Sequence, residues 1–144
     1  MAELTTGFDD RGDHHRVPVE GALVDRVCVD FAVTLQLRGE SGEWQVQIES
    51  PFVMTSSEGD ERLVVPELGA KLAVVLDVLR VEVSEARARK DGSLHVAFAD
   101  GTHVDVAPDE GYEAWNVTGP GGARIVALPG GELAVWSPTA DADG

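Results

Sequence analysis

Cysteine is nearly absent from this sequence, and long apolar runs are absent altogether. A single cysteine, Cys28, stands among 144 residues, so no disulfide can form within the chain. No apolar stretch approaches the roughly 20 residues that a membrane helix needs. The polar, acidic N-terminus has no apolar core of the kind that a secretion signal carries. We therefore expect a cytoplasmic protein that does not bind membranes.

Basic residues are scarce as well. The chain has 11 lysines and arginines against 26 aspartates and glutamates, which gives a formal net charge of -15. A field of this sign repels phosphate backbones, so we expect no nucleic-acid binding, whereas it steers a basic protein toward the surface. The same charge also serves solubility, which is the commoner reason for it.

The motifs of several enzyme classes are missing too. The glycine-rich stretches 119–122 and 130–131 join apolar runs, whereas a phosphate-binding loop must lead into a helix N-terminus. There is no nucleophile-elbow serine, no metalloprotease helix and no cysteine pair. We expect no cofactor, no metal and no catalytic residues, although coincidental carboxylate pairs leave the question of an enzyme open.

What is present is a pattern of short β-strands. The stretch 112–136 holds three apolar runs cut by two glycine turns, which predicts a three-stranded antiparallel meander at the centre of the fold. Apolar residues alternate from Val27 to Leu37, which predicts one long strand that forms a hairpin with 44–48. Pro66, Glu67 and a leucine stripe predict a helix over residues 66–80 that lies across the sheet.

Residues 81–106 predict two more hairpins, with turns at 90–92 and 99–101. A two-residue Asp-Gly turn would place core residues opposite charged ones, so hydrophobic parity favours three-residue turns that pair Leu94 with Ala88 and Val106. The opposite face then carries a row of polar residues that runs across three strands, with two more beside it: Arg87, His95 and Asp105, flanked by Arg89 and His103.

We identify seven candidate binding residues. A histidine that faces an aspartate and is flanked by an arginine could serve as a general base oriented and tuned by the aspartate, or could bind an anionic group. Such pairs are also ordinary on a solvated sheet face, and zinc is disfavoured because His95 and His103 lack a nearby thiolate and a three-ligand spacing. Tyr112 and Trp115 lie on opposite faces of one strand, so one could belong to the core and the other line a surface or pocket, and Glu113 could pair with Arg124. The candidates are Arg87, His95, His103, Asp105, Tyr112, Glu113 and Trp115.

Together these patterns predict a single α+β domain, mostly antiparallel β. We expect a bent sheet or incomplete barrel of about eight strands with one packed helix over residues 17–138. Residues 1–16 lack periodicity and are expected to form a mobile arm, and residues 139–144 a disordered acidic tail.

Several C-terminal motifs resemble a known family. Phe98-Ala99-Asp100-Gly101, Tyr112-Glu113-Ala114-Trp115, Gly119-Pro120 and the run from Pro129 to Trp136 are similar to the signature of small actinobacterial proteins that form a domain of unknown function. The resemblance is clear over the last third to half of the chain. It implies a compact single-domain bacterial protein and transfers no catalytic residue.

Three functions are consistent with the sequence. The leading hypothesis is a non-catalytic acidic protein, of the immunity or antitoxin kind, that engages a basic protein partner. The second is a small enzyme or small-molecule-binding protein with a pocket between helix and sheet near Tyr112, Trp115 and His95. The third is a structural subunit that forms a homodimer through an exposed strand edge.

Overall fold

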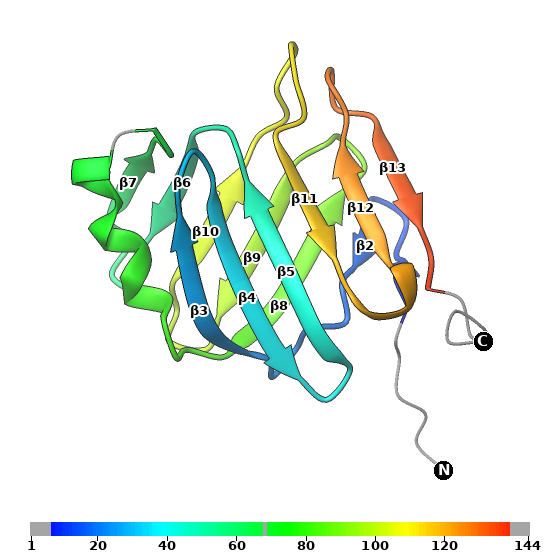
Figure 1. Cartoon of the computed structure of the whole chain (residues 1–144), viewed down its shortest axis with the longest axis horizontal. Coiled ribbons are helices and arrows are strands. Elements are labelled where there is room, and N and C mark those ends of the chain that lie inside the picture. Colours follow the sequence, from blue (N-terminus) through cyan, green and yellow to red (C-terminus); the bar gives the residue numbers. More distant parts are fainter. Residues whose placement is uncertain (1–6, 68, 139–144) are drawn as a thin grey trace.

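The computed structural model describes residues 7–67 and 69–138, which form two antiparallel sheets stacked face to face (Figure 1). The strands of sheet A are β1 (Asp9–Asp10), β2 (His14–Arg16), β6 (Phe52–Thr55), β7 (Glu61–Val64), β8 (Val83–Arg89), β9 (Leu94–Phe98) and β10 (His103–Val106). Those of sheet B are β3 (Leu23–Val29), β4 (Val33–Gly39), β5 (Gly42–Ile48), β11 (Trp115–Thr118), β12 (Arg124–Ala127) and β13 (Leu133–Trp136). The order is β1-β2-β8-β9-β10-β6-β7 in sheet A and β13-β12-β11-β5-β4-β3 in sheet B.

The core lies between the sheets and follows from the alternation of side chains along each strand. In β9, Leu94, Val96 and Phe98 face inward and are at most 3% exposed, while His95 and Ala97 point to the outer face. The inward residues of both sheets form one continuous apolar cluster. Because each sheet buries one face, each strand has a fixed register.

The expectation of an α+β domain built on one bent sheet or incomplete barrel of about eight strands is wrong. The described chain is nearly all antiparallel β, in two sheets of seven and six strands, neither of which closes. Hydrophobic parity identifies the inward face of a strand, but it does not say to which sheet the strand belongs. β5 and β6 lie in different sheets although only residues 49–51 separate them.

The helix predicted over residues 66–80 is also different in kind and place. It is a 3₁₀ helix, η1 (Gly69–Val78), which lies beside the edge strand β3 and not across a sheet (Figure 1). Its buried residues Leu72, Val75 and Val78 repeat every third position, which matches three residues per turn, and Leu76 is 55% exposed. Leu68 of the predicted stripe lies outside the described residues. A second 3₁₀ turn, η2 (Pro120–Gly122), precedes β12.

The long strand predicted from Val27 to Leu37 is two strands, β3 and β4, joined by a tight turn. Asp30 makes the turn: its backbone N–H donates to the carbonyl of Ala32 at 3.0 Å, and its carboxylate accepts from the N–H of Ala32 at 2.9 Å. The apolar alternation from Val27 to Leu37 runs straight through the turn, where its member Phe31 is 85% exposed. Apolar alternation alone therefore does not distinguish one long strand from two strands joined by a tight turn.

Two predictions of pairing are confirmed. Leu94 pairs with Ala88 and Val106, as hydrophobic parity requires. The meander is present as β11, β12 and β13, although its first strand begins at Trp115. Its third strand is not central: β13 is an edge of sheet B, and Trp136 is 51% exposed.

The ends of the chain complete the fold. Within residues 1–16, for which we expect a mobile arm, the structure places β1 and β2 at one edge of sheet A, where β2 pairs with β8. Residues 1–6 and the predicted tail 139–144 lie outside the described residues. Among the described helical segments, none has the length and apolarity to cross a bilayer.

One contact between turns fixes how the sheets meet. The turn after β8 packs backbone against backbone on the turn after β12, where a Cβ atom on Gly92 would lie 2.5 Å from the Cα of Gly131. Beside it the indole N–H of Trp115, a fully buried residue of sheet B, donates to the carbonyl of Gly92 in sheet A at 2.9 Å. We call this contact the turn clamp.

The turn clamp predicts different costs for two glycine substitutions. Gly92 and Gly130 both have positive φ, 97° and 87°, so alanine at either site costs about 1–3 kcal/mol in backbone strain. A Cβ at position 130 meets nothing within 4 Å, whereas at 92 it meets backbone. We expect Gly92→Ala to lower the free energy of unfolding clearly more than Gly130→Ala, as measured by urea denaturation. Equal losses would contradict the clamp.

Candidate functional site

The outer face of sheet A carries the polar row that the sequence predicts. Arg87 pairs with His95 across β8 and β9, and His95 pairs with Asp105 across β9 and β10. His103 lies two residues before Asp105 on β10 and therefore points to the same side of the sheet. The structure thus brings together four of the seven candidate residues on one surface.

His95, His103 and Asp105 form a compact cluster, the histidine–aspartate cluster. The Nδ1 atom of His95 lies 2.7 Å from Oδ1 of Asp105, and the Nδ1 atom of His103 lies 2.9 Å from Oδ2. The two imidazole rings lie 5.4 Å apart. Both oxygens of one carboxylate are therefore shared between two imidazoles. The side chains are 18%, 38% and 37% exposed respectively, so solvent reaches the cluster.

The carboxylate at the centre of the cluster favours its ionised form. Burial raises the pKa of Asp105, but the hydrogen bonds from His95 and then His103 outweigh it and hold the pKa below the usual range. A guanidinium nitrogen of Arg89 lies 3.8 Å from Oδ1 of Asp105. Arg87 is held instead by Glu85, whose carboxylate lies 2.9 Å from Nε.

Sequence reasoning did not place two further polar residues on this face. His14 and Arg16 of β2 pair with Arg89 and Arg87, and so extend the polar face. They line a shallow hollow of about 510 Å³ beside the cluster. The sequence signal for a strand at β2 was the alternation of polar and apolar residues that begins there and continues through Val17 and Val19, which are buried. It was too short to suggest a strand.

The remaining candidates lie elsewhere and do not meet His95. Trp115 is fully buried and belongs to the turn clamp, whereas His95 is on the outer face of sheet A. Tyr112 lies in the loop before β11 and is 48% exposed. Glu113 is exposed and is not paired with Arg124, whose guanidinium lies over the ring of Trp136 at 5.6 Å. The pocket expected between helix and sheet near Tyr112, Trp115 and His95 is therefore not formed by these residues.

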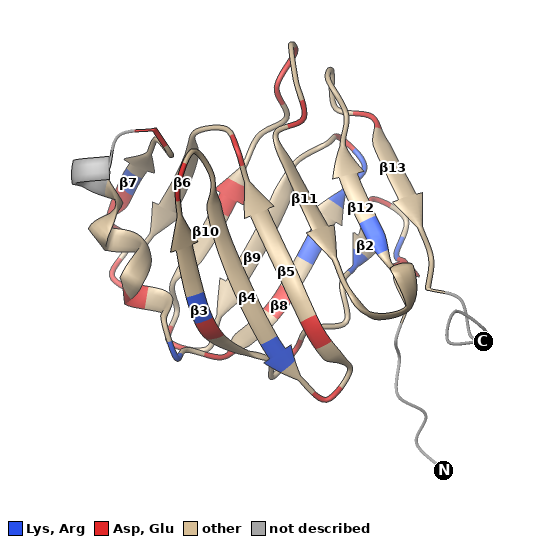
Figure 2. Cartoon of the chain, in the orientation of Figure 1, with Lys and Arg blue, Asp and Glu red and all other residues tan. Residues whose placement is uncertain are grey.

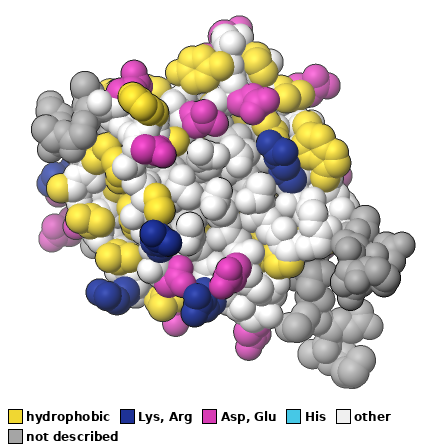
Figure 3. Space-filling view, viewed as in Figure 1, with side chains coloured by type: hydrophobic (Ala, Val, Ile, Leu, Met, Phe, Trp, Pro, Cys, Tyr) yellow, Lys and Arg dark blue, Asp and Glu magenta, His cyan; other side chains and the backbone are white. Residues whose placement is uncertain are grey.

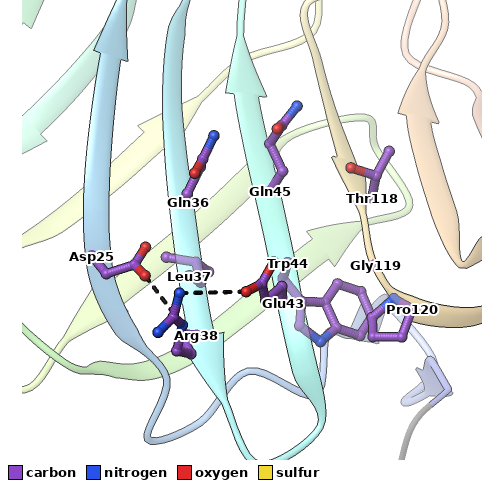
Figure 4. A pocket seen from close by; sticks show the side chains of 10 residues that line it. All are labelled: Asp25, Gln36, Leu37, Arg38, Glu43, Trp44, Gln45, Thr118, Gly119 and Pro120. Carbon is purple, nitrogen blue, oxygen red and sulfur yellow. Dashed lines mark ion pairs between the residues drawn. The ribbon is translucent and has the colours of Figure 1, made fainter.

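The outer face of sheet B has a different chemistry. Figure 3 shows a centre without charged side chains, where Gln36 pairs with Gln45 and Gln45 with Thr118. A hollow of about 360 Å³ opens there beside Arg38, which is held between Asp25 at 3.3 Å and Glu43 at 3.4 Å (Figure 4). Such a surface can hydrogen-bond to a neutral polar ligand.

The strand registers bring several acidic segments to one end of the sandwich. Ile48 pairs with both Val33 and Trp115, so the residues before β4, after β5 and before β11 lie at the same end. The turn clamp and the short β5–β6 connection bring the adjacent turns of sheet A there as well. We call this surface, formed by residues 29–32, 49–51, 65–67, 90–93, 107–114 and 128–132, the Tyr112 end.

Negative charge is concentrated at the Tyr112 end. Figure 2 shows acidic residues on both loops that project there, before β11 and between β12 and β13. Loss of solvent contact, together with the negative charges of Asp109, Glu67 and Glu49, raises the pKa of Tyr112. Eight acidic residues lie in these segments: Asp30, Glu49, Glu67, Asp91, Asp109, Glu110, Glu113 and Glu132.

Among the described side chains, none of these eight carboxylates forms an ion pair. The one described cation in the same segments is Lys90, whose ammonium lies 2.8 Å from the carboxylate of Asp10 in β1. The charge of the Tyr112 end is therefore not neutralised within the described chain.

The lowered pKa of Asp105 predicts a pH dependence. A carboxyl group whose folded pKa lies below its unfolded value stabilises the fold above the unfolded pKa, here about 3.8, and loses that contribution as pH falls through the folded pKa. We expect Asp105→Asn to be less stable than the parent at pH 6, by less than about 1 kcal/mol because the site is partly exposed. In urea unfolding the difference should shrink toward pH 3; a gap that widens there would contradict the assignment.

The comparisons with known proteins concern the whole sandwich. No curated protein and no solved structure matches this chain. A family model described as a family of unknown function (DUF6188) matches residues 15–137, from β2 to just beyond β13. This agrees with the resemblance inferred from the C-terminal motifs, while the actinobacterial origin stays a prediction. The chain therefore belongs to this family of unknown function, DUF6188.

Proposed function

We propose that the protein is a non-catalytic binding protein that engages a basic protein partner through the Tyr112 end. The observation that carries the proposal is the set of eight acidic residues at this end with no described ion-pair partner. Carboxylates that the fold leaves unmatched are available to the lysines and arginines of another protein.

The charge acts first on the rate of association. A surface of one sign creates a potential that extends about 8–10 Å into solution at physiological ionic strength and steers an oppositely charged protein toward it. Elsewhere on the protein carboxylates are paired locally, as at Arg38 and Arg16, where a guanidinium lies between two carboxylates. The Tyr112 end has no such arrangement among the described residues, so it is the surface that we assign to steering.

Two aromatic side chains at the same end supply the short-range contact. Tyr112 is 48% exposed and Phe31, at the tip of the β3–β4 turn, is 85% exposed. Large aromatic side chains dominate the energy of many interfaces because they bury area with few rotatable bonds. An exposed aromatic ringed by carboxylates suits a partner surface that offers an apolar pocket bordered by lysine or arginine.

The rigid support of this end favours recognition without large rearrangement. The loop before β11 is held where the N–H of Gly130 donates to the carbonyl of Asp109 and the N–H of Glu49 donates to that of Ala114, each at 2.8 Å. A loop that is already ordered before binding loses less conformational entropy when the complex forms. A small acidic protein that covers and neutralises a basic enzyme, as immunity and antitoxin proteins do, is the class that we propose.

Two triple variants test the proposal. Glu49→Gln, Glu110→Gln and Glu113→Gln together remove three charges from the Tyr112 end. Glu40→Gln, Glu58→Gln and Asp60→Asn remove three from the turns at the opposite end, after β4 and β6. The parent protein is used to capture partners from lysate of its source at low and high salt. We expect one basic protein to be captured and to be released by salt.

The affinity for that partner is then compared between the variants. The Tyr112-end variant should bind at least tenfold more weakly, with a shallower dependence on salt, and the opposite-end variant should bind like the parent. Equal weakening of both variants would mean that net charge, and not this surface, carries the interaction. Recovery of the bare protein at both salt concentrations would overturn the proposal.

A further inference from the structure

The histidine–aspartate cluster has the donor set of a metal site. One donor atom from each of His95, His103 and Asp105 lies within 4.8 Å of the other two. Sequence reasoning set zinc aside because the two histidines lack a nearby thiolate and a three-ligand spacing, but the structure places the carboxylate of Asp105 against both imidazoles. We propose that these three residues bind a divalent transition-metal ion of the zinc class on the outer face of sheet A, a site separate from the Tyr112 end.

The strand geometry places the three ligands without help from a loop. His103 and Asp105 are two residues apart on β10, so their side chains leave the same face, and His95 lies directly opposite Asp105 on β9. Central strands hold these Cα atoms at fixed spacing, because β9 and β10 each have a neighbour on both sides. A site on paired strands is better preorganised than one on a mobile loop.

The distances suit insertion of an ion. The two nitrogen–oxygen distances are 2.7 Å and 2.9 Å, which are hydrogen-bond lengths. Zinc bonds of about 2.0–2.2 Å in a tetrahedral arrangement separate the donor atoms by roughly 3.3 Å. The nitrogen–oxygen separations therefore need to widen by only about half an ångström, and the two imidazole nitrogens, within 4.8 Å of each other, would move closer together. The ion would replace the hydrogen bonds that now join the rings to the carboxylate.

The donor types select the class of metal. Two imidazole nitrogens and one carboxylate oxygen suit Zn²⁺, Co²⁺, Ni²⁺ and Cu²⁺, whereas Mg²⁺ and Ca²⁺ prefer sites built from oxygen. Three protein ligands leave at least one coordination position open. The side chains of the cluster are between 18% and 38% exposed, so that position can be filled from solvent by water or by a donor from another molecule.

The neighbouring guanidinium sets the strength of binding. Arg89 lies 3.8 Å from the ligand oxygen Oδ1 of Asp105, so its positive charge opposes a bound cation. The site is therefore expected to bind metal more weakly than a closed structural zinc site. Removing the charge of Arg89 should have the opposite effect from removing a ligand. Arg89→Gln is expected to bind metal about threefold to tenfold more tightly.

The test uses the full chain without a histidine tag, freed of metal by chelation. Isothermal titration with Zn²⁺ is expected to show one site per chain, and Co²⁺ is expected to give visible absorption bands of a low-coordinate site. His95→Ala and His103→Gln should each weaken binding at least tenfold. Mg²⁺ at the same concentration should not compete.

The matched control removes the other two histidines of the chain. His14 also lies against a carboxylate, with Nδ1 2.6 Å from Asp13, but that pair has no third ligand in the described structure. The double variant His14→Ala, His15→Ala should therefore bind Zn²⁺ like the parent. A thermal melt without metal shows whether each variant is folded, and metal should raise the melting temperature of the parent but not that of His95→Ala.

Three results would overturn the proposal: no stoichiometric binding of Zn²⁺, Co²⁺, Ni²⁺ or Cu²⁺ at micromolar protein, full retention of binding in folded His95→Ala and His103→Gln, or loss of binding in the double control variant alone. Tighter binding by Arg89→Gln would support the site in a way that general surface binding of cations could not, because Arg89 faces Asp105 alone among the described ion pairs.

Discussion

The turn clamp is the constraint on which the surface of this protein depends. A two-sheet sandwich is held together by its apolar core, but the hydrophobic attraction is non-directional and does not by itself specify which turns of the two sheets meet. The contact of Gly92 with Gly131 and the hydrogen bond from Trp115 to the Gly92 carbonyl are directional and join the two sheets at one end. They fix which turns of sheet A stand beside which turns of sheet B.

Two surfaces of different charge lie on this framework, one at the clamped end and one on the outer face of sheet A. The Tyr112 end gathers carboxylates that have no described ion-pair partner, and it does so because turns from both sheets meet there. The outer face of sheet A gathers three of the four histidines of the chain, His14, His95 and His103, together with Arg16, Arg87 and Arg89. An acidic protein thus keeps its histidines and several arginines on one sheet and its unmatched charge at one end. The two proposed activities can operate independently because they use different surfaces.

The sequence determines local pairing better than it determines architecture. The register from Ala86 to Val106 follows from parity alone, since only one alignment keeps Leu94, Val96 and Val104 opposite apolar residues, and the polar row on the other face follows from it. The same reasoning could not assign a strand to a sheet, because both sheets bury one face in the same core. Parity also does not reveal that the apolar alternation around Phe31 contains a turn. That turn is stabilised by a hydrogen bond to the side chain of Asp30.

The two candidate functional surfaces also differ in how far the sequence predicts them. The members of the histidine–aspartate cluster were predictable because they lie on adjacent strands of consecutive hairpins, where pairing is local. The Tyr112 end was not, because it joins segments from position 30 to position 132 through contacts between sheets. Tyr112 and Trp115 show the limit most clearly: the sequence predicts that one of them belongs to the core and the other lines a surface, but it does not say that Trp115 is the buried one.

The most direct measurement of the central claim is amide hydrogen exchange of the protein with and without the basic protein that we propose it binds, read by mass spectrometry of peptides. Loops and turns exchange quickly when free, so a partner that covers them produces a clear change. The account predicts slower exchange in residues 29–32, 107–114 and 128–132 on binding. Slowed exchange confined to β8, β9 and β10, with the loops of the Tyr112 end unchanged, would contradict it.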